Sequence, residues 1–80
     1  MARKPRPKPT QLCAKLLSVR QQLGLTQFEL AKRLNIPAYC RISEYESGRR
    51  EPNLLVLLAY ARIAGCNVDH LIDDEVELKF

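Results

Sequence analysis

The sequence predicts an all-α fold of five short helices. Apolar residues recur along the chain at helical spacing, and glycine, asparagine or threonine stands where an apolar run begins or ends. No segment alternates apolar and polar residues in the way that a half-buried strand does. Eighty residues suit one domain with a modest core, so we expect no separate sensing or catalytic domain within them.

The first predicted helix runs from about residue 10 to residue 23. Its apolar residues recur at intervals of four, three and four residues, which places them on one helical face: Leu12, Leu16, Val19 and Leu23. Thr10 is the expected N-terminal cap, and Gly24 is expected to end the helix in the left-handed conformation.

The second and third predicted helices are short and are joined by a tight turn. A Thr-x-x-Glu capping box, Thr26 to Glu29, opens the second helix, which is expected to run to about residue 34. Pro37 suits the first turn of the third helix, which is expected to end before Gly48. Two helices joined in this way can cross near a right angle and place the second one in the major groove of DNA.

Two further helices are predicted over residues 54–64 and 68–72. An asparagine precedes each of them as the expected N-terminal cap, and a glycine ends the first: Asn53, Asn67 and Gly65. The helical domain is thus expected to span residues 10–72.

Charge is unevenly distributed along the chain. Residues 1–9 alternate proline with cations and predict an extended arm, because proline lacks the amide donor that a helix needs. We interpret this arm either as a solvated tail or as a segment that contacts the minor groove or the backbone of DNA through Arg3, Lys4 and Arg6. Residues 73–80 are predicted to form an acidic tail, either solvated or attached to a partner protein. The formal net charge of +4 suits a polyanion such as DNA.

The composition argues against metal binding, catalysis and membrane insertion. Cys13, Cys40 and Cys66 are widely spaced and His70 is the single histidine, so we expect buried thiols, no metal site and no disulfide framework. We expect no cofactor and no enzymatic activity, since the sequence has no nucleophile–base motif and no glycine-rich phosphate loop.

The longest apolar stretch, residues 54–61, is far shorter than the roughly 20 residues of a membrane span. The start of the chain lacks the apolar core of a secretory signal, so we expect a cytoplasmic protein.

Four sequence motifs together carry a family resemblance. Gly-Leu-Thr-Gln begins at residue 24 and leads into Leu-Ala-x-x-Leu, Ile-x-x-Tyr-Glu-x-Gly spans residues 42–48, and Val-Asp-His-Leu-Ile spans residues 68–72. Over about residues 12–72 the chain resembles the Cro/C1 (XRE-type) helix-turn-helix family, which includes phage repressors and small bacterial regulators. The resemblance implies a compact five-helix, lambda-repressor-like domain that binds double-stranded DNA, with the helix-turn-helix at about residues 26–47.

The resemblance also implies roles for individual residues. Gln27 matches a glutamine that hydrogen-bonds a DNA phosphate, and Thr26 beside it is a second candidate backbone contact. Arg20 and Glu46 match a structural ion pair between the first helix and the end of the third. Arg49 and Arg50 match a basic loop that reaches the DNA backbone or an adjacent minor groove, although a solvated loop stays an open interpretation.

The chain departs from the family at the turn. The family usually has seven steps from the last leucine of the second helix to the isoleucine of the third, and here Leu34 and Ile42 are eight apart. The extra residue lies within residues 35–41, so it shifts the residues expected to face the bases, over a reading helix at about residues 37–47. Arg41 suits guanine, Glu44 suits the amino group of cytosine, and Tyr39 suits a thymine methyl group or a phosphate. The candidate base-reading set is Ala38, Tyr39, Arg41 and Glu44.

Apolar residues also occupy positions that are commonly polar in this family: Phe28, Leu55, Ala59 and Ile63. We interpret them either as repacking of the core or as an exposed surface for a partner. A twofold homodimer through the last two helices would double the contacts of one reading helix and impose a palindromic site.

The function that these features favour is a sequence-specific DNA-binding transcriptional regulator that represses by occupying its operator. The alternative is a protein-interaction module of the same fold, an antitoxin or adaptor, in which the extra turn residue has weakened base reading.

Overall fold

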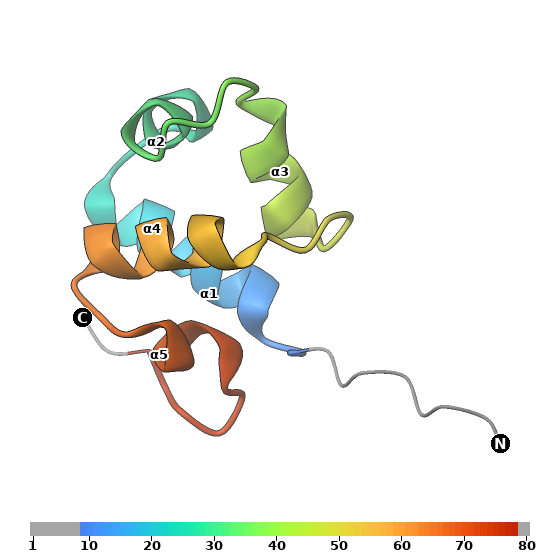
Figure 1. Ribbon diagram of the computed structural model, residues 1–80, viewed down its shortest axis with the longest axis vertical. Coiled ribbons are helices and arrows are strands. Elements are labelled where there is room, and N and C mark those ends of the chain that lie inside the picture. Colours follow the sequence, from blue (N-terminus) through green and yellow to red (C-terminus); the bar gives the residue numbers. More distant parts are fainter. Residues whose placement is uncertain (1–8, 79–80) are drawn as a thin grey trace, which may run out of the picture.

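The computed structural model describes residues 9–78, which form five helices and no strand (Figure 1). The helices are α1 (Leu12–Leu23), α2 (Gln27–Arg33), α3 (Cys40–Ser47), α4 (Leu54–Ala64) and α5 (Val68–Ile72). In Figure 1 α4 crosses α1 at the centre, with α2 and α3 on one side and α5 on the other. The predicted all-helical fold is confirmed. Among the described residues, no helix is long and apolar enough to cross a membrane.

Residues 1–8 of the N-terminal arm lie outside the described residues. Arg3, Lys4 and Arg6, the three residues expected to reach DNA from that arm, are therefore not placed by the structure.

Most predicted helix ends are confirmed, because local side chains determine them. Gly24, Gly48 and Gly65 adopt the left-handed conformation directly after α1, α3 and α4. At the start of α2, Thr26 Oγ1 accepts from the Glu29 amide at 3.1 Å, and Glu29 Oε1 accepts from the Thr26 amide at 2.9 Å. The hydrogen bond that the Thr26 amide donates favours the ionised carboxylate and lowers the pKa of Glu29.

The start of α1 corrects one predicted cap. The helix begins at Leu12, and Thr10 does not cap it through its own side chain. Asp74 instead holds the two residues that precede the helix: its Oδ2 accepts from the Thr10 amide and hydroxyl, both at 2.9 Å, and its Oδ1 accepts from the Gln11 amide at 3.0 Å. The backbone hydrogen bonds from Thr10 and Gln11 lower the pKa of Asp74.

The core receives side chains from all five helices, and Tyr60 of α4 is the largest of those that are fully buried. The helical spacing correctly places Leu12, Leu16 and Val19 of α1 in the core, but Leu23 at the end of the helix is 39% exposed. The buried apolar residues of the described chain are Leu12, Leu16, Val19, Leu30, Ala31, Ile42, Tyr45, Leu57, Tyr60, Ala61 and Leu71.

Lys15 of α1 is buried, with 6% of its surface exposed. Its ammonium donates to three backbone carbonyls, those of His70 at 2.9 Å and of Asp73 and Val76 at 2.7 Å each. A buried ammonium needs this many acceptors because it has left water, and three N–H donors meet three carbonyl oxygens. Lys15 therefore anchors the segment that follows α5.

Residues 73–78 consequently pack onto the helical domain, whereas the sequence analysis considered an acidic tail that is either solvated or attached to a partner protein. Asp74 binds the start of α1, Lys15 holds the backbone on both sides of it, and Leu78 packs against the core. The sequence hides this arrangement because Asp74 lies 64 residues from Thr10, and an acidic run close to the end of a chain is typical of a solvated segment.

We predict that Lys15→Met lowers the free energy of unfolding by about 2–3 kcal/mol, because three buried carbonyls lose a charged donor. Urea denaturation followed by circular dichroism measures the change. Gln22→Met, at an exposed position of the same helix, is the matched control and should change stability by no more than about 0.5 kcal/mol. Equal stability of the Lys15 variant and the parent protein would contradict the anchoring role.

Asp74→Asn should make the protein less stable at neutral pH and make its stability less sensitive to acid. The folded protein lowers the pKa of Asp74 below its ordinary value of 3.8, so the stabilisation is fully present above pH 3.8. It is lost as the pH falls through the lower pKa of the folded state. Melting temperatures of the parent and the variant, measured from pH 7 to pH 2, should therefore converge below pH 3.8. Glu77→Gln, which removes the same charge from the same segment, should not reproduce this convergence.

Candidate nucleic-acid interface

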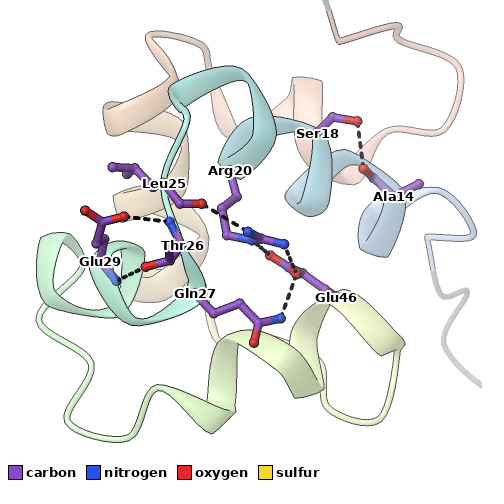
Figure 2. A network of polar contacts seen from close by, with 8 residues as sticks. All are labelled: Ala14, Ser18, Arg20, Leu25, Thr26, Gln27, Glu29 and Glu46. Atoms are coloured by element: carbon purple, nitrogen blue, oxygen red, sulfur yellow. Dashed lines mark hydrogen bonds and ion pairs between the residues drawn. The ribbon is translucent and has the colours of Figure 1, made fainter.

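The carboxylate of Glu46, near the end of α3, joins three helices (Figure 2). Arg20 of α1 contacts it through Nε, 2.7 Å from Oε2, and through Nη2, 3.1 Å from Oε1. Gln27, the first residue of α2, donates its side-chain Nε2 to the same Oε1 at 3.1 Å. The ion pair expected from the sequence is thus present, and Gln27 extends it to a third helix.

Arg20 also holds the link between α1 and α2. Its Nη1 donates to the carbonyl of Leu25 at 3.0 Å, in the short connection that leads to the Thr26 cap (Figure 2). The hydrogen bond to Glu46 raises the pKa of Arg20 and outweighs the opposing effect of burial. A forked guanidinium can satisfy a carboxylate and a carbonyl together, which a lysine at this position could not do with the same geometry.

The turn between α2 and α3 absorbs the extra residue. Asn35 adopts a left-handed conformation with φ of 56°, and the next amide, that of Ile36, returns to the carbonyl of Ala31 at 2.9 Å. Asparagine tolerates this conformation better than most residues. Ile36 packs against the core and so fixes the path of the turn.

The third helix begins later than the sequence predicts. It starts at Cys40, whereas Pro37 was expected in its first turn. Pro37, Ala38 and Tyr39 instead form a lead-in, in which the amide of Arg41 donates to the carbonyl of Ala38 at 3.0 Å. The added length therefore extends the turn, so Ala38 and Tyr39 precede the helix and Arg41 lies in its first turn.

The base-reading candidates lie in different environments. Ala38 and Tyr39 are exposed, and Arg41 is half-buried. Glu44 is already in use, since its Oε2 lies 3.6 Å from Arg50 Nε. Glu44 would have to exchange this pairing before it could accept from a base.

The basic loop after α3 is closed by backbone hydrogen bonds. The amides of Arg49 and Arg50 donate to the carbonyl of Glu44 at 3.0 and 3.3 Å, and both side chains are exposed. Gly48 permits this closure, because its φ is +82° and a Cβ there would lie 3.2 Å from the sulfur of Cys13. The loop thus presents two cations beside the end of α3.

Phe28 is exposed, as the sequence indicates, but it is not isolated. Its ring centroid lies 6.0 Å from that of Tyr39, with the two planes at 70°, and the Lys32 ammonium lies 5.1 Å from the Phe28 centroid. The contact with Tyr39 could not be predicted from the sequence, because the two residues lie on opposite sides of the turn. An aromatic side chain at a commonly polar position was the one available signal.

The apolar residues of α4 form a separate surface. Leu55 is 77% exposed, while Ala59 and Ile63 are half-buried. They line a shallow hollow with Leu34 and Leu58, and arginines stand at its rim. The residues around the hollow are Arg33, Leu34, Leu55, Leu58, Ala59, Arg62 and Ile63, so Phe28 is not part of it.

The cysteines and the histidine have positions that the sequence only partly indicates. Cys13 and Cys66 are half-buried free thiols, and burial raises the pKa of Cys66. Cys40 is exposed at the first position of α3, which corrects the expectation that all three thiols are buried. His70 is half-buried, and its Nδ1 accepts from the Asn67 amide at 3.3 Å, near the start of α5. Among residues 9–78, no group of three or more metal-ligating side chains gathers in one place.

We predict that Arg20 and Glu46 are strongly coupled in stability. Arg20 and Glu46 expose 19% and 7% of their side chains, so removing one partner leaves a nearly buried charge unpaired. Arg20→Met and Glu46→Met should each lower the free energy of unfolding by about 3 kcal/mol, and the double variant should lose clearly less than the sum. Chemical denaturation of the parent and the three variants measures the coupling. Strictly additive losses would show that the pair contributes no interaction of its own.

The chain is similar to a known family and to solved structures. The model of a helix-turn-helix family matches residues 16–71. A crystal structure of the P22 c2 repressor with a synthetic operator superposes with a TM-score of 0.72 at 27% identity, over 79% of this chain and 94% of that one. The solution structure of the P22 c2 repressor DNA-binding domain gives a TM-score of 0.74 at 23% identity, over 92% of this chain and 96% of that one. No curated protein matches the chain.

The family match extends from the middle of α1 to the end of α5 and includes the whole turn between α2 and α3. The fold matches over nearly the full length of both solved domains. This chain therefore belongs to the helix-turn-helix family of the Cro/C1 (XRE) type and has the fold of the repressor DNA-binding domains.

Proposed function

We propose that the protein is a sequence-specific DNA-binding transcriptional regulator that represses by occupying its operator. The observation that carries this proposal is the α2–turn–α3 unit. Its side chains are exposed around the start of α3, and Glu46 near the end of α3 joins it to Gln27 of α2 and Arg20 of α1. Membership of the helix-turn-helix family supports it. So does the similarity to the P22 c2 repressor, whose structure contains a synthetic operator.

In the proposed complex α3 lies in the major groove, with the lead-in turn at the base edges. Arg41 donates to N7 and O6 of a guanine, which a guanidinium can contact with two parallel hydrogen bonds. Ala38 and Tyr39 supply apolar contacts beside it. Glu44 holds Arg50 in the loop and reads a cytosine only where that pairing is exchanged.

Contacts to the DNA backbone set the register of the complex. Gln27 uses one side-chain N–H on Glu46, and the second N–H of the same amide is free to donate to a phosphate oxygen. The Thr26 hydroxyl lies beside it at the start of α2. Arg49 and Arg50 reach the backbone from the loop after α3, and Arg3, Lys4 and Arg6 of the arm contact the backbone or the minor groove. Such contacts position the protein without reading sequence.

We further propose that the protein binds as a twofold homodimer through the α4 surface. A shallow apolar hollow with a protruding Leu55 suits self-association, because each copy can insert its leucine beside Ala59 and Ile63 of the other. Two reading helices would then bind half-sites about 34–36 Å apart along the DNA. Phe28 lies outside this hollow and takes no part in the proposed interface.

Selection from a random pool of duplex DNA tests the function directly. The proposal predicts a palindromic sequence bound about 10³-fold or more tightly than random DNA, with an affinity that falls steeply as salt rises. If only weak, salt-sensitive binding without an enriched sequence is found, specific reading is wrong. The search would then turn to a protein partner for the α4 surface.

Two substitutions should separate base reading from backbone binding. Arg41→Ala should weaken binding to the selected site by about 1–3 kcal/mol and relax its sequence preference, whereas Gln27→Ala should weaken binding to selected and random DNA about equally. Fluorescence anisotropy with both duplexes measures these effects. Gln22→Ala, an exposed glutamine of α1, is the matched control and should bind like the parent protein.

Since Gln27 also contacts Glu46, the melting temperature of each variant must be compared with that of the parent. Parental binding of the selected site by a folded Arg41→Ala variant would show that α3 is turned differently in the groove.

A further inference from the structure

Two exposed aromatic rings flank the turn of the helix-turn-helix. Phe28 is 53% exposed and Tyr39 is 57% exposed, whereas Tyr45 and Tyr60 are buried in the core. Phe28 is the second residue of α2, and Tyr39 directly precedes α3. Large apolar surface left in water next to a binding face usually marks a contact site.

The two rings and a lysine form one cluster. Phe28 and Tyr39 meet edge to face, with ring centroids 6.0 Å apart and planes at 70°. Lys32, one helical turn after Phe28, places its ammonium 5.1 Å from the Phe28 centroid. Edge-to-face and cation–π contacts both constrain ring orientation, so Phe28 limits the positions that the Tyr39 ring can take.

The cluster borders a small apolar hollow between α2 and the turn. Its lining consists of Phe28, Ala31, Lys32, Ile36, Pro37 and Tyr39. Five of these residues are apolar or aromatic, and the sixth is a cation. A site of this composition suits an apolar group carried by an anionic polymer, since the walls take the apolar group and the ammonium faces the charged chain.

From these contacts we propose that the Phe28–Lys32–Tyr39 cluster reads the 5-methyl group of thymine in the operator, with Tyr39 in contact and Phe28 as its positioning residue. The inference rests on the DNA binding proposed above and names a specificity that the binding would have. The thymine methyl projects into the major groove, where a side chain directly before the reading helix meets it. The Lys32 ammonium beside the rings favours an anionic polymer such as DNA over an uncharged apolar partner.

The cluster explains why an aromatic residue is useful at position 28. The exposed Tyr39 ring would have several orientations if it stood alone in solvent. Packing against Phe28 restricts it before DNA arrives, so less conformational freedom is lost on binding. Phe28 would thus raise the preference for thymine over deoxyuridine by positioning Tyr39, without contacting the base itself.

Replacement of thymine by deoxyuridine tests the proposal, because it removes the methyl group and leaves the hydrogen-bonding edge unchanged. The full chain is titrated against its selected duplex and against duplexes in which each thymine in turn is replaced by deoxyuridine. Replacing one particular thymine in each half-site should lower the affinity of the protein for the duplex about fourfold, which is the effect of removing one methyl group from a buried contact. At the same position, 5-methylcytosine should bind about fourfold more tightly than cytosine.

Variants identify which side chains are responsible. Tyr39→Ala and Phe28→Ala should each bring the ratio of thymine to deoxyuridine affinity close to one, while Tyr39→Phe should preserve it because the ring is retained. Leu54→Ala removes an exposed apolar side chain outside the cluster and should leave the ratio unchanged. The ratio compares two duplexes on the same variant, so a general loss of stability does not move it.

The other outcomes overturn the proposal in distinct ways. A specifically bound duplex in which no deoxyuridine weakens binding contradicts methyl reading but leaves the DNA-binding function intact. A ratio that survives Phe28→Ala but not Tyr39→Ala removes the positioning role of Phe28, and a ratio lost in Tyr39→Phe assigns the contact to the hydroxyl group. If Phe28→Ala dissociates a dimer in sedimentation experiments, the cluster is a protein contact. Failure to select any duplex overturns this inference together with the proposed function.

Discussion

The Glu46 carboxylate accepts hydrogen bonds from Arg20 of α1 and from Gln27 of α2, so three helices meet at one nearly buried charge. A carboxylate removed from water is stable only while such partners surround it, so Arg20 ties α1 to α3 and Gln27 ties α2 to α3. Arg20 also binds the carbonyl before the Thr26 cap, which fixes the point where α2 begins. The side chain proposed to contact a phosphate, Gln27, is thus part of the network that shapes the fold.

Predictions based on neighbouring residues agree well with the structure. The Thr26–Glu29 capping box, the Asn53 cap and the left-handed glycines after α1, α3 and α4 depend on residues within a few positions of one another. For that reason α4 and α5 were predicted with the bounds they have in the structure. The family motifs added the Arg20–Glu46 pair, which spacing alone could not indicate because the two residues are 26 positions apart.

Features that depend on distant residues could not be predicted in this way. Asp74 binds the two residues that precede α1, and carbonyls close to the end of the chain surround the buried Lys15. Charged residues are usually exposed, so residue type alone predicts a solvated side chain at both positions. The contact between Phe28 and Tyr39 depends on the path of the turn, because the two residues lie on opposite sides of it.

The residues of α3 fall into two groups, those that hold the helix against the fold and those that are exposed. Ile42, Tyr45 and Glu46 follow one another at intervals of three and one, and they face the core and the Arg20 network. Ser43 and Ser47 are exposed on the opposite side, and Arg41 is half-buried at the start of the helix. The inward residues determine how the helix is held, while the outward residues and the lead-in turn determine what it can contact. Under the proposed function, a substitution on the outer side should therefore change which DNA sequence is bound without changing the fold, because stability depends on the inner side.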